Sequence, residues 1–405
     1  MPKPYIISAL DIGSGFIKLA VVSKKPGEDD FEILGFAREP SLGIRKGVVI
    51  DVQRVAETIA FLKNKIEQDC GRKINSVFAN VGGSHIFSTS SRGLVSVSRA
   101  DQKISEEDVE RVLRAARAIS LSSNKEIIGV FPKEFIVDGE AGVKEAIGME
   151  GVRLEAETLV LCGFSPYLKN CSQTILNAGL EVSDLIPASL ASARAVLKDR
   201  EKELGVCVLD IGAGTTDMAV FEEGNLIQTS VLPIGSSHIT SDIAICLRTD
   251  LDTAEKIKLE FGRCDIGNSK KDKKKIKIEG EGETLSFSQR ELTDIIGARV
   301  LEIFDLANKE LKKISKQGML PSGIVLTGGG ARLPNIKDLV KKELGLPCRI
   351  GASKISSTFQ EDPSLSVLYG LILEGIDAEE TRENILISGK GFKNKLKKFF
   401  RQFIP

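Results

Sequence analysis

The sequence has few of the residues from which disulfide frameworks and zinc sites are built. Its 405 residues include seven cysteines and two histidines, and no two cysteines have the Cys-x-x-Cys spacing. A disulfide scaffold uses an even set of cysteines, and a structural zinc site uses closely spaced Cys and His ligands. We therefore expect reduced thiols scattered through a hydrophobic core.

Long apolar runs are also missing. No run approaches the roughly 18 residues that a transmembrane helix needs. The apolar stretch 5–10 is short and ends at Asp11, so we expect no signal peptide. Hydrophobic residues nevertheless make up 42% of the chain, and 405 residues exceed what one core usually supports. Length and composition predict a cytosolic protein of two lobes.

Two common nucleotide-binding patterns are absent, namely the Walker loop Gly-x-x-x-x-Gly-Lys-Ser/Thr and the Rossmann fingerprint Gly-x-Gly-x-x-Gly. The chain instead contains one strand and turn twice. Residues 9–15 read Ala-Leu-Asp-Ile-Gly-Ser-Gly, and residues 208–214 read Val-Leu-Asp-Ile-Gly-Ala-Gly. Each copy leads into a second apolar strand, at 19–22 and at 218–221. The pattern predicts two hairpins.

Glycines at such turns let backbone N–H groups approach an anion. A single turn of this kind is usually ordinary turn chemistry, but two copies predict a nucleotide held between two lobes. A third glycine cluster, 328–330, follows the apolar residues 325–326. Without side chains, this backbone offers a flat surface for adenine or ribose.

These motifs, in this order, resemble the actin, Hsp70 and sugar-kinase superfamily, whose signature is two phosphate loops, an adenosine motif and two connecting helices. Within it the sequence is most similar to the FtsA family, as residues 203–206, 232–235, 238–240 and 254–258 indicate. The resemblance implies an α/β fold of the actin-like (ribonuclease H-like) two-lobed ATPase type, with an FtsA-type inserted subdomain and a C-terminal amphipathic helix.

The domain boundaries that we expect follow from this resemblance. They are 1–83 and 163–195 for the lobe 1 core, 84–162 for the inserted subdomain, 196–373 for lobe 2 with a 2B-like subdomain at about 242–312, 374–389 for a flexible linker, and 390–405 for an amphipathic membrane-targeting helix. Within the insertion we expect strands at 86–98 and 126–138. A helix between them should begin after Ser105, although Asp108 makes the capping box imperfect.

The resemblance also implies ATP and Mg²⁺ as ligands. Asp11 and Asp210 would hold the metal through water, and Lys18 would neutralise phosphate charge. Asp217 would polarise an attacking water, and the alternative is that it only caps its own turn. The other residues expected around the nucleotide are Gly13, Ser14, Gly15, Gly212, Ala213, Gly214, Thr215, Thr216, Gly235, Glu255, Lys258, Gly328, Gly329, Gly330 and Arg332.

The first connecting helix departs from the pattern of many relatives. It has Ala188-Ser189 where they carry Glu-Pro, and in Hsp70-like relatives that Glu helps orient the water. Whether the chain is an enzyme is therefore left open. We expect ATP binding with slow or absent hydrolysis.

The C-terminal residues combine positive charge with aromatic side chains. From Gly389 onward the chain has six basic residues and no acidic one, and the apolar residues recur at helical spacing. This composition is typical of an interfacial helix on anionic lipid. The alternatives are a solvated tail that docks on the body, or nonspecific binding of nucleic acid, which we do not expect as a partner. The residues assigned to the membrane are Phe392, Leu396, Lys397, Lys398, Phe399, Phe400, Arg401 and Phe403.

The resemblance implies further partners. The C-terminal tail of FtsZ would bind at helix 289–312, where Arg299 and Glu302 match docking positions of the family; the alternative is that they are ordinary surface charges. The chain would also polymerise with itself and meet later division proteins through the inserted subdomain.

The resulting hypothesis is an adaptor that anchors FtsZ filaments to the cytoplasmic face of the membrane at the division site and helps to assemble the septum. A PilM-like scaffold for pilus assembly and a soluble small-molecule kinase are the alternatives. The aromatic, basic C-terminus argues against both.

Overall fold

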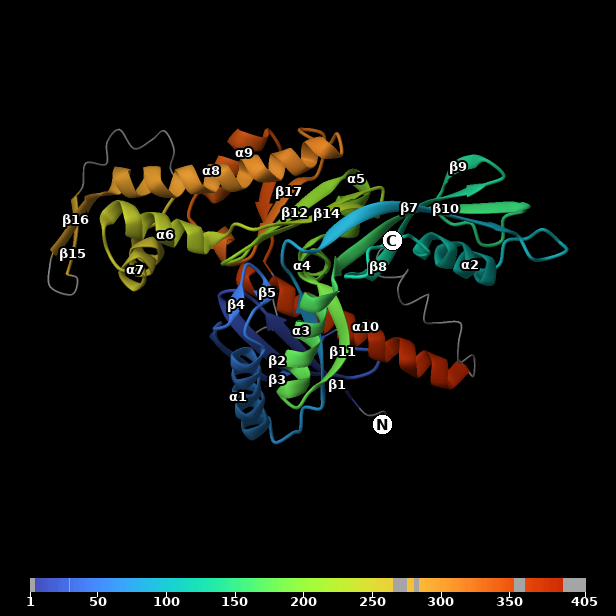
Figure 1. Ribbon diagram of the computed structural model, residues 1–405, viewed down its shortest axis with the longest axis horizontal. Helices are drawn as coiled ribbons and strands as arrows, with labels where there is room; N and C mark the ends of the chain where they lie inside the picture. The colour runs from blue at the N-terminus through green and yellow to red at the C-terminus, as the bar shows by residue number, and fades with distance from the viewer. Residues whose placement is uncertain (1–3, 29, 265–274, 280–283, 353–360, 389–405) are drawn as a thin grey trace.

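The computed structural model describes residues 4–28, 30–264, 275–279, 284–352 and 361–388 (Figure 1). Two five-stranded sheets form the centres of two lobes, and a four-stranded sheet forms an inserted subdomain at one end of the molecule. This α/β architecture is the actin-like fold expected from the motifs.

The sheet of lobe 1 has the order β11-β6-β1-β2-β3. Strands β1 and β2 form the first hairpin and pair antiparallel, whereas β6 runs parallel to β1 on the other side. A short hairpin, β4–β5, follows β3. The strands are β1 Tyr5–Ile12, β2 Phe16–Lys24, β3 Glu32–Pro40, β4 Ile44–Arg45, β5 Val48–Val49, β6 Ser76–Val81 and β11 Glu181–Pro187.

The sheet of lobe 2 has the order β18-β17-β12-β13-β14, which is the same arrangement around a second hairpin. Here β12 and β13 pair antiparallel and β17 runs parallel to β12. A separate two-stranded sheet, β15–β16, precedes α8. The strands are β12 Val206–Ile211, β13 Thr216–Glu222, β14 Asn225–Leu232, β15 Lys275–Glu279, β16 Thr284–Ser288, β17 Gly323–Thr327 and β18 Cys348–Ile350.

The helices cover these sheets and connect the lobes. They are α1 Val52–Cys70, α2 Glu106–Arg117, α3 Ser165–Asn177, α4 Ala188–Val196, α5 Asp199–Leu204, α6 Ser236–Leu247, α7 Leu251–Phe261, α8 Gln289–Lys313, α9 Ile336–Leu344 and α10 Ser366–Ser388, with 3₁₀ turns η2 at Gly329–Arg332 and η3 at Pro363–Leu365. Side-chain caps begin several of them. Ser288, for example, accepts from the Glu291 N–H at the start of α8.

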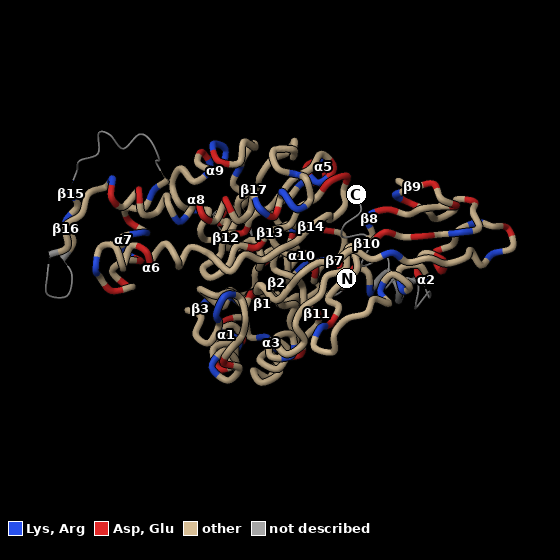
Figure 2. Tube along the Cα trace, turned by 45° about the horizontal axis from the view of Figure 1, so that its top comes forward, with Lys and Arg blue, Asp and Glu red and all other residues tan. Residues whose placement is uncertain are grey.

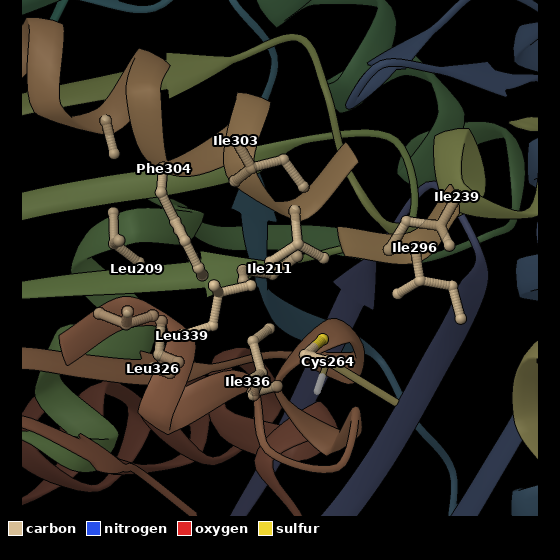
Figure 3. Close-up of a cluster of buried hydrophobic side chains, with 14 of the residues drawn as sticks. Leu209, Ile211, Ile239, Cys264, Ile296, Ile303, Phe304, Leu326, Ile336 and Leu339 are labelled. Carbon is tan, nitrogen blue, oxygen red and sulfur yellow. The ribbon is translucent and has the colours of Figure 1, made fainter. Parts of the chain in front are cut away.

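The core of lobe 2 forms where α8 and α9 pack on the central strands (Figure 3). Leu209 and Ile211 extend from β12 toward Phe304 of α8 and Leu339 of α9, and all four are buried. Each fully buried side chain of this kind contributes about 1.5–3 kcal/mol. The core therefore fixes β12, and with it the turn that follows Ile211.

The inserted subdomain lies within lobe 1 in sequence but also contacts lobe 2. Its sheet has the order β7-β10-β8-β9, with strands β7 Phe87–Ser96, β8 Lys125–Val137, β9 Glu140–Val143 and β10 Arg153–Phe164. Ser105 and Asp108 form a complete capping box at the start of α2. Asn225 of lobe 2 donates to the Lys133 carbonyl at 2.9 Å. The insertion thus contacts lobe 2 in addition to being part of the chain of lobe 1.

Helix α10 corrects the prediction of a flexible linker over 374–389. The helix continues to Ser388, and the predicted lobe 2 boundary at 373 falls inside it. Leu368 and Ile372 are buried against β1 of lobe 1, and ion pairs from Arg194 to Asp377 at 3.0 Å and from Lys24 to Glu380 hold the following turns. Local polarity suggested a linker, but tertiary packing makes these residues helical.

The cysteines are reduced, as the sequence predicts, and charged residues of both signs are mixed along the chain. All seven cysteines are free thiols, and all but Cys70 and Cys246 are buried. Residues of both charge signs are interspersed over both lobes and the inserted sheet (Figure 2). Within the described residues, none of the helices is both long enough and apolar enough to cross a membrane.

Candidate functional site

The two hairpin turns have the same backbone geometry. In lobe 1 the Gly13 N–H donates to the Phe16 carbonyl at 3.2 Å, and in lobe 2 the Gly212 N–H donates to the Thr215 carbonyl at 2.9 Å. The repeat that is visible in the sequence is therefore a repeat of structure.

The two turns meet across the boundary between the lobes. A Cβ placed on Gly15 would lie 2.9 Å from Cβ of Ala213, and one on Gly214 would lie 2.9 Å from Oγ of Ser14. Real side chains do not tolerate such distances. Glycine at these positions lets the predicted phosphate loops approach each other.

In lobe 1, Asp11 is held by a cation and an amide. Lys18 Nζ lies 2.6 Å from Asp11 Oδ2, and Asn80 Nδ2 donates to Asp11 Oδ1 at 3.1 Å. The sequence predicted Asp11 and Lys18 but not Asn80. The available signal was an amide in the otherwise apolar segment 77–81.

In lobe 2, two carboxyl groups face each other without such a cation. Asp210 is opposite Asp217 across β12 and β13, and each is 6% exposed. Burial, together with the charges of Asp217 and Asp11, raises the pKa of Asp210 to about 8. Burial also raises the pKa of Asp217 to about 7. Both groups thus retain protons near neutral pH until a cation approaches.

The environment of Asp217 fits a bound cation or water. Thr215 Oγ1 donates to Asp217 Oδ2 at 3.1 Å, but Oδ1 of Asp217 is buried without a hydrogen-bond partner. Such an atom normally has a partner. Among the described residues, no three His, Cys, Asp or Glu side chains form a cluster that could hold a metal ion directly. Carboxylate oxygens are ligands that Mg²⁺ prefers, and Mg²⁺ usually keeps several waters.

The third glycine cluster lies next to this carboxyl pair. A Cβ on Gly328, where φ is +83°, would overlap Oδ1 of Asp210, and one on Gly330 would overlap the side chain of Ile211. Gly329 has open space at the same position. The cluster provides backbone surface beside Asp210. The guanidinium of Arg332 is already paired with Asp362, with Nε–Oδ1 at 3.0 Å.

Helix α6 joins the second turn to Glu255 and Lys258. The Ser236 N–H at its start donates to the Gly212 carbonyl at 2.8 Å. Lys258, 7% exposed, pairs with Glu255 at 2.7 Å and donates to Thr240 Oγ1 at 2.8 Å. These two predicted residues are therefore connected to the second turn through α6.

At the start of the first connecting helix, α4, where the sequence differs from many relatives, hydroxyl groups form a hydrogen-bonded network. Ser189 on α4 is 2% exposed, and its Oγ lies 2.8 Å from Thr229 Oγ1 of lobe 2. Thr229 in turn donates to the Met218 carbonyl at 2.9 Å. Ser189 thus links the two lobes, next to Ala188, the position at which those relatives would carry a charged glutamate.

Other predicted residues lie elsewhere or outside the described residues. Arg299 on α8 donates to both oxygens of Asp242 on α6, at 2.6 and 2.7 Å, and also to Glu302. It therefore already has two carboxylate partners. The predicted membrane residues, between Phe392 and Phe403, are outside the described part of the chain.

Comparison with known proteins identifies relatives over nearly the whole chain. A family model described as cell division protein FtsA matches residues 207–370, and one described as an SHS2 domain inserted in FTSA matches 83–162. The FtsA of Pseudomonas aeruginosa is 33% identical, covering 96% of this chain and 94% of that protein. The FtsA of Borreliella burgdorferi is 36% identical and covers 96% of each.

Solved structures with low sequence identity share the fold. A PilM–PilN type IV pilus biogenesis complex aligns with a TM-score of 0.65 at 18% identity, covering 91% of this chain and 98% of that one. MreB5 of Spiroplasma citri bound to ADP aligns with a TM-score of 0.57 at 15% identity, covering 94% and 99%. These similarities concern the fold alone.

Proposed function

Because this chain belongs to the FtsA family of cell division proteins, we propose that it is an ATP-binding adaptor that anchors FtsZ filaments to the cytoplasmic face of the membrane and helps to assemble the septum. The nucleotide part of the proposal depends above all on the meeting of two similar turns beside three buried carboxyl groups. MreB5 with ADP, a protein of the same fold, supports it.

Each group at the turns has a role in this proposal. Backbone N–H groups of residues 13–15 and 212–216 would hold the phosphates. Asp11 and Asp210 would hold Mg²⁺ through water molecules. When bound, this ion would neutralise negative charge next to the phosphates. Lys18 would add a positive charge from lobe 1. Asp217, with one oxygen free, would accept a hydrogen bond from a water molecule.

We propose that hydrolysis is slow or absent. The network of Ser189 and Thr229 supplies hydroxyls and no carboxylate, so Asp217 is the remaining candidate for orienting a water. A nucleotide that is bound but not cleaved still stabilises the closed arrangement of the lobes, because it binds that arrangement more tightly.

The anchoring part of the proposal is based on residues at the C-terminus. Lysines and phenylalanines between residues 390 and 405 would bind anionic lipid. Helix α10 ends at Ser388, so the anchor would follow a helix docked on lobe 1. Self-association and contacts of the inserted subdomain with later division proteins belong to the same proposal.

Co-sedimentation with anionic liposomes tests the adaptor. FtsZ is mixed with liposomes, ATP, Mg²⁺ and either the full chain or a chain ending at Ser388. We expect FtsZ to sediment only with the full chain, and high salt to weaken the sedimentation without abolishing it. If this protein sediments and FtsZ does not, it is a membrane scaffold for another partner. If neither sediments, the anchor is wrong.

A substitution on α8 tests the proposed FtsZ site separately. In the full chain, Arg299→Glu breaks the pair with Asp242 and places a negative charge on α8. Arg290→Glu is the matched control, because Arg290 is on the same helix and pairs with Asp294 at 3.7 Å on the surface. We expect Arg299→Glu to abolish sedimentation of FtsZ while the protein itself still sediments. An equal effect of both variants would contradict the assignment.

A further inference from the structure

Asn80 uses both ends of its amide beside Asp11. Its Nδ2 donates to Asp11 Oδ1 at 3.1 Å, and its Oδ1 accepts the backbone N–H of Ile12 at 2.6 Å. Only this orientation of the amide satisfies both contacts, since a carboxylate accepts and an N–H donates. Asn80 and Asp11 are 5% and 4% exposed. Both hydrogen bonds are therefore shielded from water.

The equivalent place in lobe 2 shows that the fold does not require this amide. Strands β6 and β17 have the same position in the two sheets, parallel to the central strand. The β1–β6 register pairs Leu10 with Ala79, which brings Asn80 level with Asp11, and β12–β17 pairs Asp210 with Thr327. The Thr327 hydroxyl bonds instead to Pro363 O at 3.1 Å and to Ser366.

We propose that Asn80 is a positioning residue that fixes the Asp11 carboxylate for a magnesium-bound nucleotide. This inference rests on the proposed nucleotide binding. In the structure, Lys18 is bonded to Asp11, and a lysine that turns toward phosphate gives up part of that bond. The amide then holds the carboxylate in place. Because Oδ1 of Asn80 accepts a hydrogen bond from the Ile12 N–H, the amide cannot rotate without breaking a second buried hydrogen bond.

Two variants separate this role from a merely structural one. Asn80→Asp keeps the oxygen that accepts from Ile12 and removes the donor to Asp11. Asn80→Thr introduces the residue that lobe 2 has at the equivalent place. The two variants differ in charge, so an effect that they share does not come from an added carboxylate. Asn170→Ala is the control, because Asn170 lies in the same lobe and contacts the Val49 carbonyl.

The measurement is the affinity of the full-length protein for a fluorescent ATP analogue, titrated once with Mg²⁺ and once with EDTA. The ratio of the affinity with Mg²⁺ to the affinity in EDTA reports how much the metal ion strengthens nucleotide binding. We expect both Asn80 variants to lower this ratio roughly 10-fold to 100-fold, as is usual when the partner of a metal-site carboxylate is removed. The affinity in EDTA and the result for Asn170→Ala should stay close to wild type.

Three outcomes would overturn the inference. If both variants fold and keep the wild-type ratio, Asn80 is only structural. If neither variant folds, as judged by its melting temperature, Asn80 is required for the fold and the positioning role fails. If the wild type shows no nucleotide binding even with Mg²⁺, the proposed function itself fails. Binding by the wild type with an unchanged ratio in the variants distinguishes failure of the inference from failure of the function.

Discussion

The two hairpins have the same backbone but opposite electrostatics. Asp11 is opposite Lys18 across β1 and β2, whereas Asp210 is opposite Asp217 across β12 and β13. A lysine and an aspartate thus occupy equivalent places. In lobe 1 the carboxylate is neutralised within the protein, and in lobe 2 two buried carboxyl groups retain protons and leave one oxygen without a partner.

This difference assigns different tasks to the two copies. A buried pair of like charges is unfavourable unless protons or a cation neutralise it. Lobe 2 is therefore the lobe in which a metal ion gains most, and lobe 1 contributes a positive charge of its own. The fold supplies two similar hairpins, and the single difference between Lys18 and Asp217 at equivalent places makes them complementary.

The largest effect should come from removing the cation of lobe 1. Lys18→Ala leaves Asp11 charged and buried, because the side chains of Lys18 and Asp11 are only 11% and 5% exposed. Breaking a buried pair in this way costs about 3–5 kcal/mol. Urea unfolding measures the free energy. Lys25→Ala, which breaks an exposed pair with Glu28, is the control and should cost less than about 1 kcal/mol.

Replacing a buried carboxyl group of lobe 2 by a neutral side chain should raise the free energy of unfolding, whereas Lys18→Ala should lower it. Burial raises the pKa of Asp217 to about 7, so from about pH 4 to pH 7 the folded protein keeps a proton that the unfolded chain loses. Stability contributed by this group therefore falls as pH rises through that window. Without ligand, Asp217→Asn should be more stable than wild type by roughly 4 kcal/mol at pH 8, because a rise of about three pKa units corresponds to about 1.4 kcal/mol per unit.

The pH dependence distinguishes this explanation from a general packing effect. The advantage of Asp217→Asn should grow between about pH 4 and pH 8, as urea unfolding at several pH values would show. Asp305→Asn, an exposed carboxyl on α8, should show no such trend. A constant advantage at all pH values would contradict the raised pKa.

Binding of Mg²⁺ and nucleotide should release protons from lobe 2. At pH 7 the raised pKa values of Asp210 and Asp217 leave protons that a cation displaces. Calorimetry in buffers with different ionisation enthalpies should give a release of about one proton. The release should fall for Asp217→Asn, and an uptake of protons would reverse the assignment.

The smallest effect concerns the support of Asp210. The Ser192 side chain lowers the pKa of this carboxyl, against the stronger effect of burial, which raises it. Ser192→Ala should therefore shift the pH midpoint of magnesium-dependent nucleotide binding upward by less than about one unit, since one hydrogen bond contributes about 1 kcal/mol. Ser172→Ala, which removes a helix-surface hydroxyl bonded to Leu168 O, should leave the midpoint unchanged.

Features written in adjacent residues were predictable. The repeated turn, the helix that begins after Ser105, and α8 from Gln289 each follow a signal in neighbouring residues. The signals are an Asp-x-Gly turn after an apolar strand and a capping residue before an apolar stripe. The linker prediction was wrong because Asp377 and Glu380 look solvated in sequence, but they pair with Arg194 and Lys24 from distant parts of the chain.

The sequence by itself determined that there are two turns, each with a carboxyl group and glycines, because such patterns depend only on neighbouring residues. Only the tertiary structure decided what each carboxyl group meets. Asn80 reaches Asp11 across 69 residues through a parallel strand pair, and burial leaves one oxygen of Asp217, Oδ1, without a hydrogen-bond partner. Charge, burial and long-range pairing together set the chemistry, and they are properties of the packed chain.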